Sequence, residues 1–274
     1  MKKESEISRL TSYWLRHKPT DGNLAIDELG WVEIGELLDA LTRRGHVVST
    51  DELFILSTSF DKIRWEFDGS KKKIRATHGH SIPVTIEKTA TPPSVLYHGT
   101  ALKSLKAIID GGLKAMNRQF VHLSSQYDAA LVVGQRHGKA LVLEVDAEGL
   151  HQDGCTFYQT SDNVWLINEV PAKYLQFGPW YSTSPDEPEL VNELKREVGQ
   201  GHLLFGKTEN LKAIMRRVDR DDCLFIDKQS QEIYEVHLTW SKGIESDARL
   251  PSITYHKNLD DWLATGFLED YRDF

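Results

Sequence analysis

Proline 19 fixes the end of the first regular element of this chain. Proline lacks a backbone N–H and its ring clashes with the preceding turn, so a helix cannot continue through it. Apolar residues recur at helical spacing before it, which predicts an amphipathic helix over residues 4–15. These residues are Ile7, Leu10, Tyr13 and Trp14.

Arg16, His17 and Lys18 follow one another where this helix ends. With no acidic residue adjacent in the sequence, such a group favours binding of an anion. The alternative is that the pair Arg16-His17 only neutralises the negative end of the helix dipole.

The segment that follows predicts more helices and then a hairpin. We expect a short strand at 24–26 and helices over 31–41 and from about residue 50, where Ser49 or Thr50 is the cap. Asp68-Gly69 is a strong turn signal between strands at 64–67 and 73–76. Helices followed by a hairpin are the order of a winged helix, usually a nucleic-acid-binding module. The hairpin's Lys71, Lys72 and Lys73 could face nucleic acid or only solvent.

Residues 93 to about 180 predict short strands mixed with helices. The predicted strands lie at 95–98, 121–124, 140–145 and 163–167, and the helices at 102–109 and 128–135. This mixture favours a bent α+β sheet. The sequence has neither GxGxxG nor GxxxxGK[ST], so a Rossmann domain and a P-loop are unsupported.

His98 and His122 stand where predicted strands meet turns, and Gly99 follows the first of these strands. A glycine there lets the backbone approach a ligand closely. The two histidines have no third ligand at zinc-site spacing, so we predict no metal. Structural, hydrogen-bonded histidines are the alternative to a ligand site.

Charge and cysteine content limit the partners. The 274 residues carry a net charge of −8, with 14 basic and 14 acidic residues in 1–92, a net −1 in 93–182 and a net −7 in 183–274. An RNA-facing surface should therefore lie in the first two segments. Two distant cysteines and the absence of a signal peptide or a long apolar run fit a reducing cytoplasm.

The order of several motifs resembles the RNA 2′-phosphotransferases, which complete tRNA splicing in some organisms. The resemblance runs from about residue 6 to 177. The segments that carry it are Leu15-Arg16-His17-Lys18-Pro19, Gly30-Trp31, Asp61-Lys62-Ile63-Arg64, Ile74-Arg75-Ala76, Gly79-His80-Ser81, Leu96-Tyr97-His98-Gly99-Thr100, Arg118 before Val121-His122-Leu123-Ser124, Gly134-Gln135-Arg136-His137-Gly138, and Val164-Trp165-Leu166.

The resemblance implies an α+β protein with a winged-helix RNA-binding lobe at 1–90 and a lobe of ADP-ribosyltransferase type at 93–181 that holds NAD⁺. The catalytic set that it implies is Arg16, His17, Arg64 and Arg118. The residues that it places on the cofactor side are Gly79, His80, Ser81, His98, Gly99, Thr100, His122 and Ser124, with Arg75, Arg136 and His137 as weaker candidates. One departure is His78-Gly79, where the family usually has Gln-Gly.

The implied reaction transfers an internal RNA 2′-phosphate to NAD⁺. The phosphate displaces nicotinamide, and the ADP-ribosylated 2′-phosphate then yields ADP-ribose 1″,2″-cyclic phosphate. His17 could bind phosphate or transfer a proton. The alternatives are an ADP-ribosyltransferase that caps nucleic-acid phosphates or modifies another acceptor, and a winged-helix nucleic-acid binder that only senses NAD⁺.

Residues 183–274 lie outside this resemblance. Ser182–Pro188 is typical of a linker, and 186–274 predicts a small acidic α+β module. Strands are expected at 223–226 and 234–240, a strand or short helix at 211–215 and a helix from Leu259. The segment is similar to small bacterial proteins of unassigned function that share its His-Leu-Thr-Trp strand. We expect it to bind a protein partner or to regulate the enzyme.

Overall fold

The computed structural model describes residues 2–58, 64–183 and 188–274, with the backbone alone for residues 2–4. It divides the chain into two compact units. Unit 1 holds Met1–Pro92, Lys114–Ser125 and Gly154–Glu169, and unit 2 holds Pro93–Leu113, Gln126–Asp153 and Val170–Phe274. The motif residues Asp61–Ile63 and most of the predicted linker, Ser184–Glu187, lie outside the described residues.

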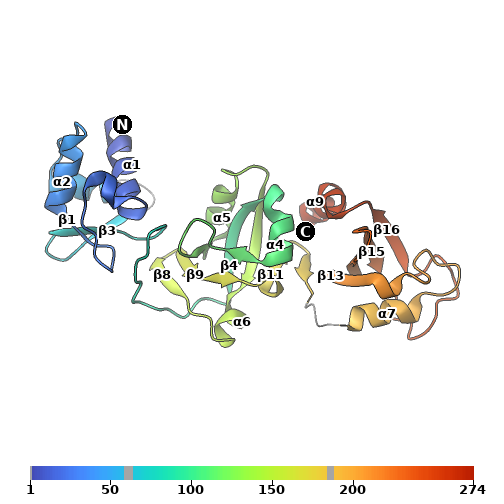
Figure 1. Ribbon diagram of the computed structural model, residues 1–274. Helices are drawn as coiled ribbons and strands as arrows, with labels where there is room; N and C mark the ends of the chain where they lie inside the picture. Colours follow the sequence, from blue (N-terminus) through green and yellow to red (C-terminus); the bar gives the residue numbers. More distant parts are fainter. Residues whose placement is uncertain (1, 59–63, 184–187) are drawn as a thin grey trace. The chain divides into compact units, whose positions relative to one another are not determined.

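The first part of unit 1 consists of helices and a small antiparallel sheet, as predicted (Figure 1). In the sheet, β1 and β2 both pair with β3. The elements are α1 (Lys2–Arg16), the 3-10 turn η1 (Pro19–Gly22), β1 (Val32–Glu33), α2 (Ile34–Arg43), α3 (Thr50–Thr58), β2 (Trp65–Phe67) and β3 (Lys73–Ala76).

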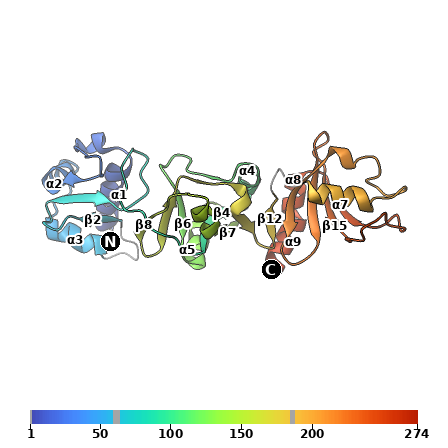
Figure 2. The ribbon, with the colours of Figure 1, turned by 90° about the horizontal axis from the view of Figure 1, so that it is seen from below.

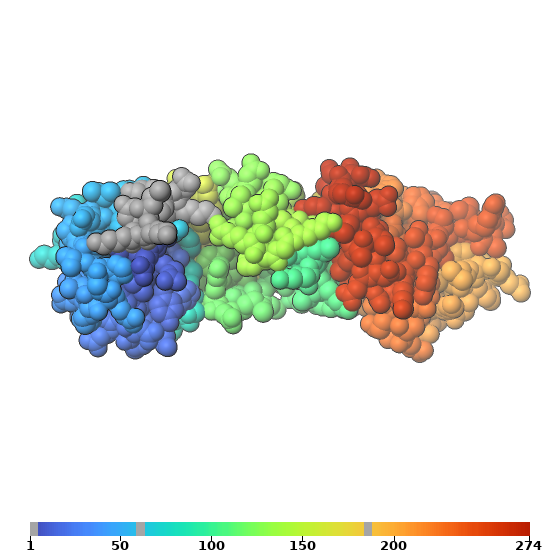
Figure 3. Space-filling model, turned by 90° about the horizontal axis from the view of Figure 1, so that it is seen from above, coloured from blue at the N-terminus to red at the C-terminus, as the bar shows by residue number. Residues whose placement is uncertain are grey.

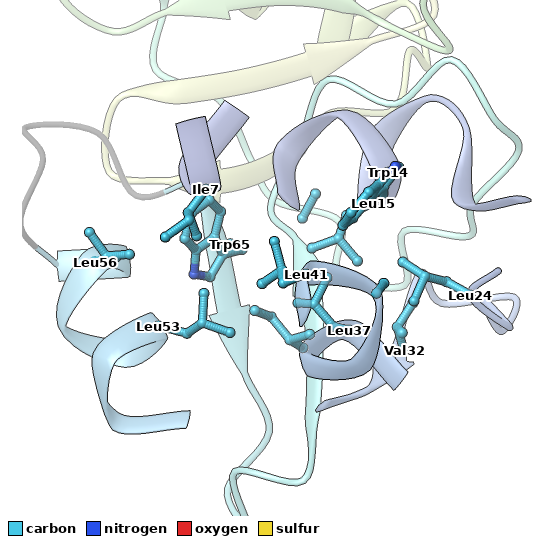
Figure 4. Packing of buried hydrophobic residues seen from close by; sticks show 13 residues of the cluster. Ile7, Trp14, Leu15, Leu24, Val32, Leu37, Leu41, Leu53, Leu56 and Trp65 are labelled. Atoms are coloured by element: carbon cyan, nitrogen blue, oxygen red, sulfur yellow. The ribbon is translucent and has the colours of Figure 1, made fainter. Parts of the chain in front are cut away.

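One hydrophobic core joins these helices to the sheet. Trp14 and Leu15 of α1, Leu41 of α2 and Leu53 of α3 are buried against Trp65 of β2 (Figure 4). Each such side chain stabilises the fold by about 1.5–3 kcal/mol through burial alone. Because Trp14 and Leu15 lie deep in this core, the two residues that follow them in α1 and at its end are held firmly in place.

The cap of α3 follows the predicted chemistry. The Ser49 hydroxyl accepts a hydrogen bond from the Glu52 N–H at 3.2 Å, and the Glu52 carboxylate accepts one from the Ser49 N–H at 2.7 Å. This reciprocal pair is a capping box. The strand predicted at 24–26 is wrong, because these residues are irregular and the backbone instead pairs at β1.

The second part of unit 1 is an antiparallel sheet in the order β6-β9-β8. Its strands are β6 (Val121–Ser124), β8 (Tyr158–Ser161) and β9 (Val164–Ile167). Two hydrogen bonds join Gln119, just before β6, to the backbone of Val84. Two short strands lie where the chain passes between the units: β5 (Leu113–Lys114) and β10 (Glu169–Val170).

Unit 2 is built on an antiparallel sheet in the order β4-β7-β11-β12-β13-β14-β15-β16. This pairing agrees with the predicted α+β class. The elements of its first half are β4 (Val95–Ala101), η2 (Leu102–Ser104), α4 (Leu105–Gly111), α5 (Tyr127–Gly134), β7 (Ala140–Asp146), α6 (Ala147–Gln152), η3 (Ala172–Tyr174), β11 (Leu175–Phe177) and β12 (Trp180–Ser182). Helix α5 packs on β4 and β7.

The acidic C-terminal segment continues this same sheet, since β13 pairs with β12. Helix α7 covers one face of its strands and α8 and α9 the other (Figures 1 and 2). The sequence did not predict α7, β16 or α9. The elements are α7 (Glu189–Glu197), η4 (Thr208–Asn210), β13 (Leu211–Arg217), β14 (Asp222–Asp227), β15 (Ile233–His237), β16 (Ser252–His256), α8 (Leu259–Ala264) and α9 (Gly266–Asp273).

The strand predicted at 234–240 stops early, at His237. Beyond it, the backbone N–H groups of Thr239 and Trp240 donate to the buried carboxylate of Glu197 at 3.0 and 2.5 Å. These bonds replace ladder hydrogen bonds, and Trp240 takes a positive φ of 53°. A carboxylate from α7 therefore ends the strand.

Helix α9 is fastened to the first half of unit 2. The Tyr271 hydroxyl accepts a hydrogen bond from the N–H of Val142 in β7 at 2.9 Å and lies 3.3 Å from its carbonyl oxygen, to which it donates. Asp270 accepts from the Trp180 indole at 2.9 Å. The residues near the C-terminus therefore lie against the first half of unit 2, and this contact is visible at the surface (Figure 3). The division of the chain into 1–90, 93–181 and 186–274 stays a prediction. Strand β13 of the last segment pairs with β12 of the segment before it, so these two segments share a sheet.

Among the described residues, no helix combines the length and the apolar character that crossing a membrane requires. Cys155 and Cys223 are both free thiols.

We predict that Tyr271→Phe lowers the free energy of unfolding by about 1–3 kcal/mol, because the buried Val142 N–H and C=O lose their partner. Urea unfolding measures this difference. Tyr97→Phe is the matched control, since the Tyr97 hydroxyl makes no hydrogen bond within the described part of unit 2. Equal losses in the two variants would contradict the role given to Tyr271.

Candidate active site

Backbone hydrogen bonds hold Arg16 at the end of α1. Its guanidinium Nη2 donates to the Arg64 carbonyl at 3.0 Å. Its own carbonyl accepts from the Ser81 N–H at 2.9 Å. The end of α1, the start of β2 and the turn after β3 therefore meet at one residue.

Arg64 and Arg118 stand close enough to Arg16 to act on it electrostatically. Burial first, then the positive charges of Arg64 and Arg118, lower the pKa of Arg16 to about 10. Arg64 is oriented by a hydrogen bond from Nη1 to the Ser8 hydroxyl at 2.7 Å. Arg118 is exposed, in the segment before β6.

Three guanidinium groups, those of Arg16, Arg64 and Arg118, form what we call the arginine cluster. Within the described part of the chain, Arg16 and Arg118 form no ion pair. Crowding like charges at a partly buried place costs free energy, which a bound anion offsets. Guanidinium groups are the donors best suited to phosphate oxygens.

His17 borders the arginine cluster. Its Nδ1 lies 3.0 Å from the Ser81 hydroxyl. Partial burial, then Arg16 and Arg118, lower the pKa of His17, so the ring is held in the neutral form more than a free histidine would be. Neutral imidazole can still donate one hydrogen bond or accept a proton.

The expectation that Arg16, His17 and Lys18 form one group without an acidic partner is wrong for Lys18. Its ammonium forms an ion pair with Asp21 at 3.5 Å, and the Tyr13 hydroxyl donates to the same carboxylate at 3.2 Å. Asp21 is three residues beyond Lys18, in the 3-10 turn η1 that Pro19 begins. Lys18 is therefore neutralised locally by Asp21.

His78 is a site residue that the sequence analysis missed. Its ring packs edge-to-face on His122 at 5.8 Å between centroids, and its Nδ1 lies 3.0 Å from the Thr77 hydroxyl. Burial first, then Arg16, lower the pKa of His78 to about 3. The only sequence signal that pointed to His78 was that a histidine stands here, before Gly79, where the RNA 2′-phosphotransferases usually have glutamine.

The turn Gly79-His80-Ser81 is placed beside Arg16. Gly79 has φ +87° and lies against the Arg16 side chain. The His80 ring is buried, with Nε2 next to Gly30, so this side chain faces the interior of the protein; burial, then Arg16, lower its pKa to about 4. The His80 carbonyl accepts from the Gln119 N–H at 2.9 Å.

His122 and Ser124 both project from β6, two residues apart and so on the same face of the strand. The His122 Nδ1 lies 3.1 Å from the Phe120 carbonyl, to which it can donate. The contact of His122 with His78 places β6 next to the arginine cluster.

His98, Gly99 and Thr100 lie in unit 2, inside β4. The expectation that Gly99 stands just past its strand is wrong, because β4 continues to Ala101. A Cβ on Gly99 would lie 1.8 Å from the Ala130 carbonyl oxygen. Close packing of α5 therefore requires a glycine here, whatever role these residues have toward a cofactor.

The basic residues of the hairpin are largely committed to local contacts. The Lys71 ammonium lies 4.1 Å from the Phe54 ring centroid, and Lys73 forms ion pairs with Asp27 and Glu33. Arg75 donates to Glu66 at 2.6 Å and stacks on Trp31. A structural role thus accounts for Arg75. Among the described residues, no three histidine, cysteine or carboxylate side chains gather as metal ligands.

Comparisons with known proteins define an enzyme of the transferase class. A profile described as "RNA 2′-phosphotransferase, Tpt1 / KptA family" matches residues 2–169. This is more than half of the chain, so the chain belongs to the RNA 2′-phosphotransferase family.

Similar proteins carry the same name. A "Probable RNA 2′-phosphotransferase" of Fusobacterium nucleatum is 40% identical over 179 residues, which cover 65% of this chain and 100% of the relative. One of Streptomyces coelicolor is 43% identical over 173 residues, covering 63% of this chain and 94% of the relative. This chain is longer than these relatives by its C-terminal segment.

We predict that stability falls as the pH is lowered from 6.5 towards 4. Between these values the unfolded chain protonates His78 and His80, whose folded pKa values are about 3 and about 4, while the folded chain does not. Each ring contributes on the order of 1 kcal/mol per pH unit. Urea unfolding of wild type and His78→Gln between pH 7 and 5 measures this, and the variant should show the shallower decline. Identical slopes, or NMR signals of a protonated His78 at pH 5.5, would contradict it.

Proposed function

We propose that this chain is an NAD⁺-dependent RNA 2′-phosphotransferase. It moves an internal RNA 2′-phosphate to NAD⁺ through an ADP-ribosylated 2′-phosphate and releases nicotinamide and ADP-ribose 1″,2″-cyclic phosphate. The observation that carries the proposal is the arginine cluster, in which burial and then the charges of Arg64 and Arg118 lower the pKa of Arg16 and the Arg16 guanidinium bonds to the Arg64 carbonyl. Family membership supports an RNA phosphate as that anion.

In this proposal Arg16, Arg64 and Arg118 bind the phosphate oxygens. A phosphate monoester is largely dianionic near pH 7, so it needs no base to act as a nucleophile. The task left to the protein is to hold it and to stabilise charge that shifts among its oxygens, which arginine forks do well. The hydrogen bonds to the Arg64 carbonyl and from Ser81 N–H fix Arg16 for this role before substrate arrives.

His17 has the position and the protonation state for either of two tasks. Its Nδ1 is within hydrogen-bond distance of Ser81, and its pKa is lowered by burial and by Arg16. A phosphate beside it would raise that pKa again, which suits a group that takes up a proton when substrate is bound.

The residues of unit 1 that the resemblance assigns to the cofactor suit the phosphate and ribose groups of NAD⁺ by their chemistry. The left-handed turn at Gly79 and the Ser124 hydroxyl lie in segments that adjoin Arg16 and His122. When bound, NAD⁺ supplies the electrophilic carbon and the leaving nicotinamide. The residues of unit 1 proposed to hold it are Gly79, His80, Ser81, His122 and Ser124. For His98, Gly99 and Thr100, in β4 of unit 2, the assignment to the cofactor rests on the resemblance alone.

We further propose that the helices and hairpin of residues 1–90 are a winged-helix lobe for RNA and that 93–181 is an ADP-ribosyltransferase-like lobe. The element order α1-β1-α2-α3-β2-β3 supports the first assignment. The hairpin lysines contribute little to it, because their local contacts with Phe54, Asp27 and Glu33 leave α1 as the better candidate for RNA.

The direct test mixes the protein, NAD⁺ and an RNA bearing one internal 2′-phosphate, and follows both products. We expect a 2′-hydroxyl RNA and ADP-ribose 1″,2″-cyclic phosphate. Accumulation of ADP-ribosylated RNA would favour an ADP-ribosyltransferase that stops at capping. Binding of NAD⁺ without any reaction would favour a sensor.

We predict that Arg118→Ala lowers kcat about 10²–10³-fold, by analogy with the loss of one donor to a developing oxyanion. Single-turnover kinetics with saturating NAD⁺ measures the chemical steps. Arg44→Ala is the matched control, because Arg44 is exposed just after α2 and its side chain contacts none of the site residues described. Unchanged kinetics in Arg118→Ala would remove the shared-phosphate proposal.

For the C-terminal segment we retain the proposal of a protein partner, supported by its net charge of −7. Deleting 183–274 is a poor test, because it removes the partner strand of β12 and the Tyr271 contact with Val142. Replacing exposed Leu203 and Phe205 with Asp in the full chain keeps both. Unchanged complexes in cell extracts and unchanged turnover would overturn the proposal.

A further inference from the structure

The solvent face of α1 carries a row of side chains that leads to the arginine cluster. Arg9, Tyr13 and His17 follow one another at intervals of four residues, so they share one side of the helix, ending at the turn after Arg16. The row spans about 12 Å at 1.5 Å per residue, a length comparable with about three stacked nucleotides. The opposite face of α1 is the buried one, with Ile7, Trp14 and Leu15.

Tyr13 is the aromatic member of this row. Its side chain is 38% exposed, although a tyrosine ring is largely apolar. Two contacts orient the Tyr13 ring. Its hydroxyl donates a hydrogen bond to Asp21, and its centroid lies 6.2 Å from the centroid of the His17 ring. A rigid, exposed ring next to a phosphate site is what a nucleobase needs for stacking.

Arg9 is the cationic member. It is exposed, and within the described part of unit 1 its guanidinium makes no ion pair or hydrogen bond. With Leu10 and Tyr13 it lines a surface hollow of about 290 Å³. This is near the lower end of the roughly 300–1,000 Å³ typical of ligand pockets, so it suits part of a nucleotide.

Carboxylates also face this row, and the first of them is paired with a cation. Asp21 accepts from Tyr13 and pairs with Lys18, and Glu6 lies 3.9 Å from the His46 Nε2. Arg9 supplies a positive charge that can pair with a phosphodiester. The side of α1 next to the proposed phosphate site therefore offers a single RNA strand a cation in Arg9 and a stacking surface in Tyr13.

We propose that Tyr13 is a stacking platform for the nucleobase adjacent to the 2′-phosphorylated nucleotide, with Arg9 contacting the RNA backbone one step further along. The inference rests on the proposed function and extends it, because it assigns the path of the RNA strand that leaves the phosphate site. Tyr13 is a positioning residue: it orients the RNA and leaves the chemical steps to other groups.

The test uses the full chain and fluorescence anisotropy with a labelled RNA that carries one internal 2′-phosphate, without NAD⁺. We expect Tyr13→Ala to weaken RNA binding about tenfold, since a base–aromatic stack is worth roughly that factor or more. Tyr13→Phe keeps the ring and should bind within about twofold of wild type. Tyr255→Ala, an exposed tyrosine of β16, is the matched control and should leave binding unchanged.

RNAs that are abasic on the 5′ or the 3′ side of the 2′-phosphorylated nucleotide identify the contact. One of these two abasic RNAs should bind wild type about tenfold more weakly than the intact RNA does. Tyr13→Ala should bind that abasic RNA and the intact RNA with the same affinity. Equal losses from both abasic RNAs in wild type and Tyr13→Ala would overturn the proposal, as would Tyr13→Ala binding like wild type. A turnover assay separates the stacking proposal from the proposed function. If wild type binds the RNA but never removes its 2′-phosphate, the proposed function is overturned. The comparison of the abasic RNAs still decides whether Tyr13 stacks on a base.

Discussion

The candidate site of unit 1 depends on how Arg16, Arg64 and Arg118 are held near one another. Three guanidinium groups do not gather unless the backbone forces them together, and here it does: the Arg64 carbonyl and the Ser81 N–H both bond to Arg16. The cost is met by the core behind them, where Trp14 and Leu15 are fully buried directly before Arg16 in the chain. The stability of this core thus keeps an otherwise unfavourable charge cluster in place, and in the proposed function that cluster binds the RNA phosphate.

Burial and the charge of Arg16 together explain the lowered pKa values of the histidines around the cluster. His78, His80 and His17 all have lowered pKa values, with burial as the main cause and Arg16 as the next. Neutral imidazoles beside cationic guanidiniums give the site donors and acceptors without adding positive charge. In the proposed function a dianionic phosphate reverses this balance, which would couple substrate binding to protonation of these histidines.

Much of the first 180 residues could be predicted from the sequence, because local signals there agree with the tertiary structure. The capping box at Ser49, the turn at Asp68-Gly69 and proline 19 each specify a boundary without help from distant residues. The sequence-based predictions failed where a residue distant in the sequence determines the local structure. The end of β15 depends on Glu197, the neutralisation of Lys18 on a turn that brings Asp21 back, and the glycine at 99 on the approach of α5. Motif order pointed to the arginines, whereas His78 entered the site only through contacts that no spacing rule reveals.

The pairing of β12 with β13 has a consequence for shortened forms of this protein. Two strands joined edge to edge hide their N–H and C=O groups from other chains. A chain ended at Ser182 would leave the far edge of β12 open over Trp180–Ser182, next to apolar surface that α8 and the ring of Trp262 normally cover. Such an edge is a template for strand addition by another copy. In the full chain β13 of the acidic segment occupies this edge, so shortened forms are expected to self-associate more readily than the full chain.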